Sequence, residues 1–138
     1  MTRLALVALA SAAALAGPAD AYTPEVDYAL HCEGCHLADG SATPGKVPAL
    51  AGSLARFLRV PGGREYLARV PGVANAPLSD AELAALLDWT LRRFDGAALP
   101  PDFAPYTARE VHALREQPLV DVRGARDALL GSPATREP

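Results

Sequence analysis

The chain has 138 residues, of which 50% are hydrophobic and 21% are charged, and its formal net charge is −3 at pH 7. This length suits one small domain with a single core. The slightly acidic balance argues against nucleic-acid binding, which requires a basic surface.

The first 21 residues have the pattern of a secretory signal peptide. Arg3 supplies a short positive region, and Leu4 to Ala16 form an unbroken run of Leu, Ala, Val and Ser. Ala19-Asp20-Ala21 then gives a small-x-small cleavage site. The apolar run is short for a membrane span. We therefore predict that residues 1–21 are removed on export, and that the protein contacts a membrane only if this segment is retained.

A helix is predicted to begin at Thr23-Pro24, because threonine caps helix N-termini and proline fits the first helical position. It leads into Cys32-Glu33-Gly34-Cys35-His36, a Cys-x-x-Cys-His pentapeptide that contains the only two cysteines. This pattern attaches a c-type haem. Each thiol forms a thioether bond to a former vinyl group of the porphyrin, and the histidine is the proximal ligand of the iron. We predict haem attachment at Cys32 and Cys35, with His36 bound to iron.

Two other interpretations of the cysteine pair are considered. A thioredoxin-like redox pair expects a βαβ context, which the sequence does not show. A structural zinc site needs four nitrogen or sulfur ligands, and the only further candidates are His31 and His112. A redox or regulatory thiol pair remains the main alternative to haem attachment.

The rest of the chain is predicted to be helical with long loops, because no alternating strand pattern occurs. Residues 37–52 are rich in Gly, Pro, Ser and Thr and are predicted to be a loop. Ser79-Asp80-Ala81-Glu82 and Thr107-Ala108-Arg109-Glu110 are capping boxes, each of which starts a helix. Helices are predicted over residues 53–60, 63–70, 79–96, 107–117 and, more weakly, 120–130. Pro-Gly pairs are expected to stop two of them, at 61–62 and 71–72.

With these elements the chain resembles the class I c-type cytochromes over residues 22–96. The features that match are the helix into Cys32–His36, the segment Val47-Pro48-Ala49-Leu50-Ala51-Gly52, and Leu78–Leu83 opening the last helix. The resemblance implies an all-α, cytochrome c-like fold of three to five helices around one covalently attached haem c. It divides the chain into a signal peptide (1–21), a cytochrome c domain (22–97) and a C-terminal helical extension (98–138). It also implies that the carbonyl of Pro48 accepts a hydrogen bond from His36, which would fix the imidazole tautomer.

The second axial ligand is the feature in which the sequence departs from this family. The family usually places a methionine shortly before the last helix, but the only methionine here is Met1. In residues 71–78 the only polar side chain is Asn75. Asn75 is therefore a candidate iron ligand, or a hydrogen-bond donor beside an open or water-bound iron. His112 folding back from the extension is a third candidate, and Lys46, a tyrosine or a partner's ligand are the remaining ones.

Positive charge gathers in the middle of the predicted domain. The residues are Arg56, Arg59, Arg64 and Arg69. One of them is a candidate partner for a haem propionate, since a buried carboxylate needs a cation. The alternative is an ordinary solvated helix surface.

The predicted function is that of an exported monohaem cytochrome, not an enzyme, that carries single electrons between periplasmic redox proteins. The partner would be a dehydrogenase or an oxidase. The alternative is a haem protein that binds O2 or NO, or reacts with peroxide, at an open or weakly ligated iron, because losing the methionine lowers the reduction potential or leaves the iron open. A third hypothesis is a subunit whose distal face is completed by a partner protein.

Overall fold

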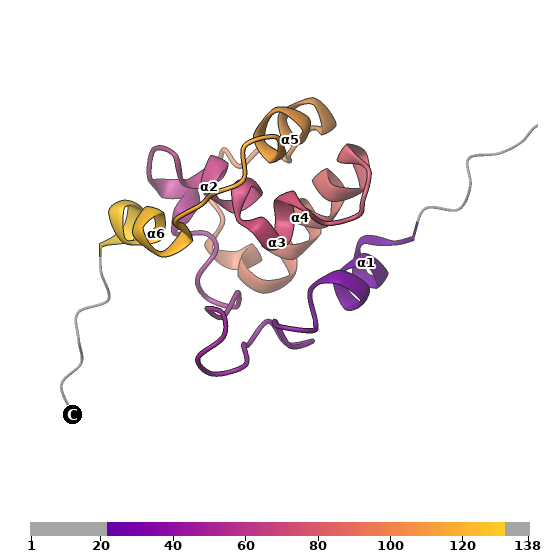
Figure 1. Cartoon of the computed structure of the whole chain (residues 1–138), viewed down its shortest axis with the longest axis horizontal. Helices are drawn as coiled ribbons and strands as arrows, with labels where there is room; N and C mark the ends of the chain where they lie inside the picture. The colour runs from indigo at the N-terminus through magenta and orange to yellow at the C-terminus, as the bar shows by residue number, and fades with distance from the viewer. Residues whose placement is uncertain (1–21, 132–138) are drawn as a thin grey trace, which may run out of the picture.

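The computed structural model describes residues 22–131, so the predicted signal peptide lies outside the described residues. Six α-helices and two short 3-10 helices occur in this range (Figure 1). They are α1 (Pro24–His31), η1 (Phe57–Arg59), α2 (Gly63–Arg69), α3 (Pro71–Ala74), α4 (Asp80–Asp95), η2 (Gly96–Ala98), α5 (Ala108–Arg115) and α6 (Val122–Leu130). No strand forms within residues 22–131, where one isolated β-bridge joins His36 and Ala42. The predicted all-α, cytochrome c-like fold is confirmed. None of the described helices is long and apolar enough to cross a membrane.

Helices α1 and α4 begin as their capping residues predict. The Thr23 side chain accepts a hydrogen bond from the N–H of Val26, and Ser79 and Glu82 form both bonds of a capping box. The two helices pack against each other, with the Tyr28 ring buried 5.3 Å from the ring of Trp89. This packing holds the end of α1, and therefore the cysteine motif, against the longest helix of the fold.

The loop after the motif is closed by backbone hydrogen bonds and anchored on α4. The carbonyl of Gly40 accepts from the N–H groups of Leu50 and Ala51, at 2.8 and 3.0 Å. Gly40 has a φ of +76° and lies against the Phe94 ring, so a side chain there would be strained and would collide with the ring. Further along, the buried carboxylate of Asp95 accepts a hydrogen bond from the N–H of Ala55 at 2.7 Å.

One sequence prediction about local structure is wrong. The helix expected over 53–60 is only the 3-10 turn η1, because the hydroxyl of Ser53 bonds back to loop carbonyls and Asp95 takes the N–H of Ala55. The Pro-Gly pair at 71–72 stops a helix as predicted, because α2 ends at Arg69. Pro71 then starts the short helix α3, since its fixed φ and missing N–H suit the first helical position.

The C-terminal extension packs onto the rest of the fold through two helices. Helix α5 contacts α2, α3 and α4, and α6 contacts α2. The side chain of Val111 on α5 has no exposed surface and belongs to the same apolar cluster as α4.

Three of the four central arginines hold this extension in place. Arg59 donates to the carbonyl of Ala98, and Arg69 donates to that of Gln117, both at 2.7 Å. Arg64 pairs with Glu110 and also donates to two carbonyls of the preceding loop. These three side chains are therefore bound to the extension and are not free surface charges. None of them lines the large cavity of the fold.

Candidate haem site

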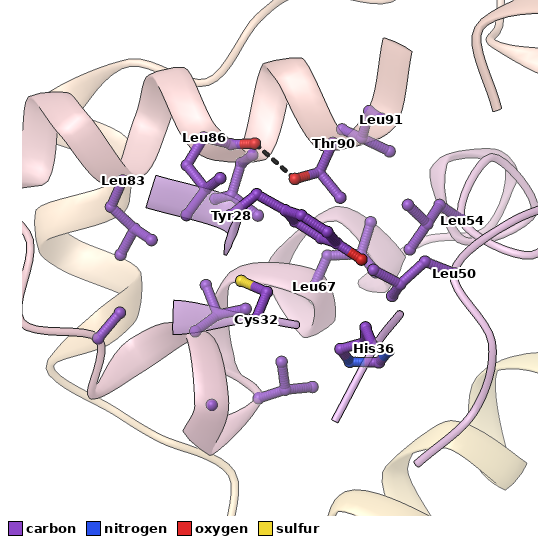
Figure 2. A pocket seen from close by; sticks show the side chains of 15 residues that line it. Tyr28, Cys32, His36, Leu50, Leu54, Leu67, Leu83, Leu86, Thr90 and Leu91 are labelled. Carbon is purple, nitrogen blue, oxygen red and sulfur yellow. Dashed lines mark hydrogen bonds between the residues drawn. The ribbon is translucent and has the colours of Figure 1, made fainter. Parts of the chain in front are cut away.

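A mostly apolar cavity lies between α1, the loop after the motif, α3 and α4. It has two lobes with volumes of about 650 and 1060 Å³, part of which opens to solvent. The lobes share eight lining residues: Cys32, His36, Leu50, Leu54, Leu67, Val70, Gly72 and Val73. The first lobe is also walled by leucines of α4 (Figure 2). A cavity of this size and polarity suits a large, flat, apolar cofactor.

The cysteine motif forms one wall of this cavity. Cys32 is the C-cap of α1, and its carbonyl accepts hydrogen bonds from the N–H groups of Cys35 and His36, at 3.1 and 2.9 Å. This tight turn brings the two sulfurs and the imidazole to the same lobe, which Pro48 also lines. Four of the five predicted site residues are therefore gathered at one place.

His36 has the environment of a metal ligand. Burial lowers the pKa of its imidazole, and the carbonyl of Pro48 opposes that shift. The Pro48 carbonyl is thus a close neighbour of the ring, but Nδ1 of His36 is buried without a well-formed hydrogen bond. A neutral imidazole fits a haem iron, since neutral histidine is the form that binds metals.

The cysteine environment does not favour redox chemistry. Burial raises the pKa of the Cys32 thiol to about 11, with added repulsion from Asp27 and Glu33. Reactive thiols instead have a lowered pKa, because the thiolate is the nucleophile. The raised pKa of Cys32 therefore counts against the alternative of a redox thiol pair.

Asn75 is the predicted site residue that the structure does not bring to the cavity. It is the C-cap of α3, its side chain is exposed, and it lines neither lobe. Its neighbours Ala74 and Ala76 are buried, so the chain turns Asn75 outward between them. The same segment instead contributes apolar groups to the cavity, from Val73 and Ala76.

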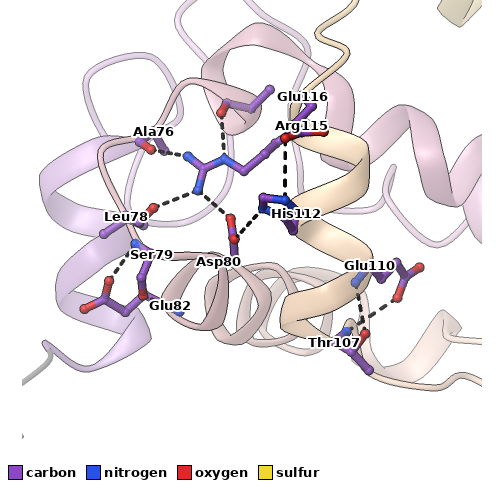
Figure 3. Close-up of polar contacts among 11 residues, drawn as sticks. Ala76, Leu78, Ser79, Asp80, Glu82, Thr107, Glu110, His112, Arg115 and Glu116 are labelled. Carbon is purple, nitrogen blue, oxygen red and sulfur yellow. Dashed lines mark hydrogen bonds and ion pairs between the residues drawn. The ribbon is translucent and has the colours of Figure 1, made fainter.

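His112 does not fold back into the cavity, and that candidate for the second axial ligand is wrong for this structure. Its Nδ1 lies 3.0 Å from a carboxylate oxygen of Asp80, and its Nε2 lies 3.5 Å from Glu116 (Figure 3). The side chain is 62% exposed. Lys46 is also exposed and lines neither lobe. Two tyrosines do line the cavity, but the hydroxyls of Tyr28 and Tyr66 both donate to backbone carbonyls.

Two arginines of the extension were missed by sequence reasoning. Arg126 on α6 lines the larger lobe, and its guanidinium carbon lies 5.1 Å from the centre of the Phe57 ring. Arg115 on α5 binds the segment that follows α3. Only the amphipathic pattern of the weakly predicted last helix could have pointed to Arg126, and nothing local points to Arg115.

The helical fold, the apolar cavity and the Cys-x-x-Cys-His wall together define a protein with covalently attached haem. No family model matches the chain. It is 37% identical over 106 residues to "Cytochrome c-552" of Thermus thermophilus. The match covers 64% of this chain and 81% of that protein. A second "Cytochrome c-552", also from Thermus thermophilus, has the same identity, with 72% of its length covered.

The chain belongs to the class I c-type cytochromes, and its cofactor is covalently attached haem c. It is therefore a protein of electron transfer. The expectation of this family from the motif and the two terminal helices is confirmed.

Proposed function

We propose that this chain is an exported monohaem cytochrome that carries single electrons between periplasmic redox proteins. Haem would be attached at Cys32 and Cys35, with His36 as the proximal ligand. The observation that carries the proposal is the convergence of these three residues on one apolar cavity. The bound haem supplies the one-electron Fe(III)/Fe(II) couple.

The residues around His36 would prepare it for this role. Burial lowers the pKa of His36, so the imidazole is held neutral and available to iron. The carbonyl of Pro48 is its neighbour and would accept the N–H that does not face the metal, which orients the ring and strengthens it as a ligand. Tyr28 supports the same wall, because its hydroxyl donates to the carbonyl of Leu37 at 2.9 Å.

We further propose that residues 22–97 hold the haem and that the extension, 98–138, completes the cavity. Arg126 is the extension's contribution, since its guanidinium lines the larger lobe together with the motif. A haem propionate is a carboxylate, and burying it requires a cation that can also donate hydrogen bonds. Arg126 fills that role better than Arg59, Arg64 or Arg69, which are bound to the extension.

The docking surface for a redox partner would lie beside the motif. Leu30 and Leu37 flank the pentapeptide and are 60% and 46% exposed, and Cys35 is exposed as well. An apolar surface next to the cofactor allows a transient partner to approach it. The partner would be a periplasmic dehydrogenase or oxidase. Export to the periplasm is supported by the signal pattern of residues 1–21.

A second candidate function is the binding of a small neutral molecule such as NO or O2 at an open iron. The observation that favours it is the set of apolar residues that α3 and its flanks give the cavity: Val70, Gly72, Val73 and Ala76. Reaction with peroxide has less support, because it needs polar groups that transfer protons, and this part of the lining is apolar.

One experiment separates the two functions. The purified ferrous protein is mixed with carbon monoxide, and its reduction potential is measured by spectroscopic titration. A carrier gives a reversible one-electron curve and slow or incomplete carbon monoxide binding. Rapid, complete binding would instead support the ligand-binding function, and the absence of a reversible one-electron curve would overturn the carrier proposal.

A further inference from the structure

The side chain of Arg115 binds the chain segment between α3 and α4 at four points. Its Nε donates to the carbonyl of Ala74 at 3.0 Å, and its Nη2 donates to that of Ala76 at 2.5 Å. Its Nη1 donates to the carbonyl of Leu78 at 2.7 Å and to the carboxylate of Asp80 at 3.1 Å. All of these contacts converge on one guanidinium (Figure 3). We call residues 74–80 the α3–α4 segment.

The three carbonyls have different places in the segment, and that of Ala76 also accepts a hydrogen bond from the N–H of Leu78 at 2.8 Å. That of Ala74 belongs to the last residue of α3, whose terminal carbonyls have no partner within the helix. Those of Ala76 and Leu78 lie in the turn that leads to α4. A planar guanidinium can serve several acceptors at fixed angles, so Arg115 sets the path of the whole segment.

The path of this segment decides which side chains face the cavity. Ala76 lines the cavity, and Val73 lines it one residue before the segment. Asn75, held between the first two carbonyls that Arg115 binds, is exposed. Asn75 is also the only polar side chain of residues 71–78. A change of path at 74–76 would therefore exchange an apolar group for an amide at the cavity wall.

We propose that Arg115 is a positioning residue that holds the α3–α4 segment against the haem cavity and keeps Asn75 out of it. Arg115 lies on α5, which does not itself line the cavity. The extension thereby determines indirectly which side chains lie near the iron. This inference rests on the proposed haem site.

The simplest rival is that Arg115 only fastens α5 to the core. Arg64 provides a matched control, because it also joins the extension to the core, through Glu110 and the carbonyls of Ala104 and Pro105. None of its contacts involves the α3–α4 segment. Arg64→Gln therefore loosens the extension without releasing the segment, whereas Arg115→Gln does both.

The test measures hydrogen exchange of the haem-loaded protein together with its ferric absorption spectrum. The amides of Ala74, Asn75, Ala76 and Leu78 are all hydrogen-bonded, so their exchange can be followed. In Arg115→Gln we expect these amides to exchange about tenfold faster, because losing the equivalent of one hydrogen bond lowers the local stability of the segment. Arg64→Gln should leave these amides within about twofold of the unaltered protein. Arg115→Lys keeps the positive charge but loses the several donors of the planar guanidinium. The exchange rates of these amides should therefore lie between those of Arg115→Gln and Arg64→Gln.

The spectrum tests what the segment does for the iron. We expect Arg115→Gln to change the ferric spectrum, and the added substitution Asn75→Ala to reverse that change, because Asn75 is the group released. Equal exchange at 74–78 in Arg115→Gln and Arg64→Gln would overturn the positioning role. A spectrum unchanged in Arg115→Gln, or a change that Asn75→Ala does not reverse, would overturn the part played by Asn75. A chain that carries no haem would overturn the proposed site instead, so the two failures are distinct.

Discussion

Removing the hydroxyl of Tyr28 should weaken the link between α1, α4 and the haem motif. The side chain is 1% exposed, and its hydroxyl donates to the carbonyl of Leu37 at 2.9 Å. Burial is the main reason that the pKa of Tyr28 is raised to about 12, so the hydroxyl remains a donor at neutral pH. Tyr28→Phe keeps the ring in its contacts with Trp89 and Phe94. Only the hydrogen bond is lost.

The expected cost is about 1 kcal/mol, the net value of one such bond, because the Leu37 carbonyl still accepts from the N–H of Gly40 at 2.8 Å. In a chain of this size that corresponds to a fall in melting temperature of about 4 °C. Tyr66→Phe is the matched control. Tyr66 is 6% exposed, but its hydroxyl lies 3.5 Å from the carbonyl of Val122, at the limit of a hydrogen bond. It should cost less than about 0.5 kcal/mol.

Both variants are compared with the unaltered protein by urea unfolding of the haem-loaded form, followed by circular dichroism. The reasoning would be refuted if Tyr66→Phe destabilised the protein as much as Tyr28→Phe. It would also be refuted if Tyr28→Phe had no measurable effect, since the hydrogen bond to Leu37 would then not hold the motif.

Two further predictions concern the extension. Val111→Ala should destabilise the protein by about 2–3 kcal/mol in urea unfolding, because it removes two buried methyl groups from the shared core and leaves a cavity. A loss of stability below about 0.5 kcal/mol would show that the extension does not share that core. Asp80 is the second site, and hydrogen bonding from Arg115 is the main reason that its pKa is lowered below the ordinary 3.8. Its contribution to stability is therefore present above about pH 3.8 and lost as pH falls through the lower pKa of the folded state. Asp80→Asn should be less stable at neutral pH and lose less stability on acidification, and parallel curves of stability against pH for the two proteins would contradict this.

Local signals carried most of what the sequence predicted correctly. The starts of α1 and α4 follow from Thr23-Pro24 and from the Ser79 capping box, since these contacts span only three residues. The haem motif is equally local, because its turn brings both sulfurs and His36 together within five residues.

Long-range contacts explain the rest. Arg115 meets the carbonyl of Ala74 across 41 positions of sequence, and Asp95 meets the N–H of Ala55 across 40. No periodicity or capping pattern encodes such pairs. Asn75 shows the same limit, since its chemistry made it a candidate ligand, but it is exposed between the buried Ala74 and Ala76, whose carbonyls bind Arg115.

Covalent haem attachment at Cys32 and Cys35 is tested most directly by the intact mass of the purified protein after expression with a working haem-attachment system. We expect a red protein whose mass equals the polypeptide plus one haem, bound so that denaturation does not release it. Cys32→Ser with Cys35→Ser should give a product of bare polypeptide mass after the same denaturation. A colourless protein with intact cysteines and bare polypeptide mass would contradict haem attachment at these two residues.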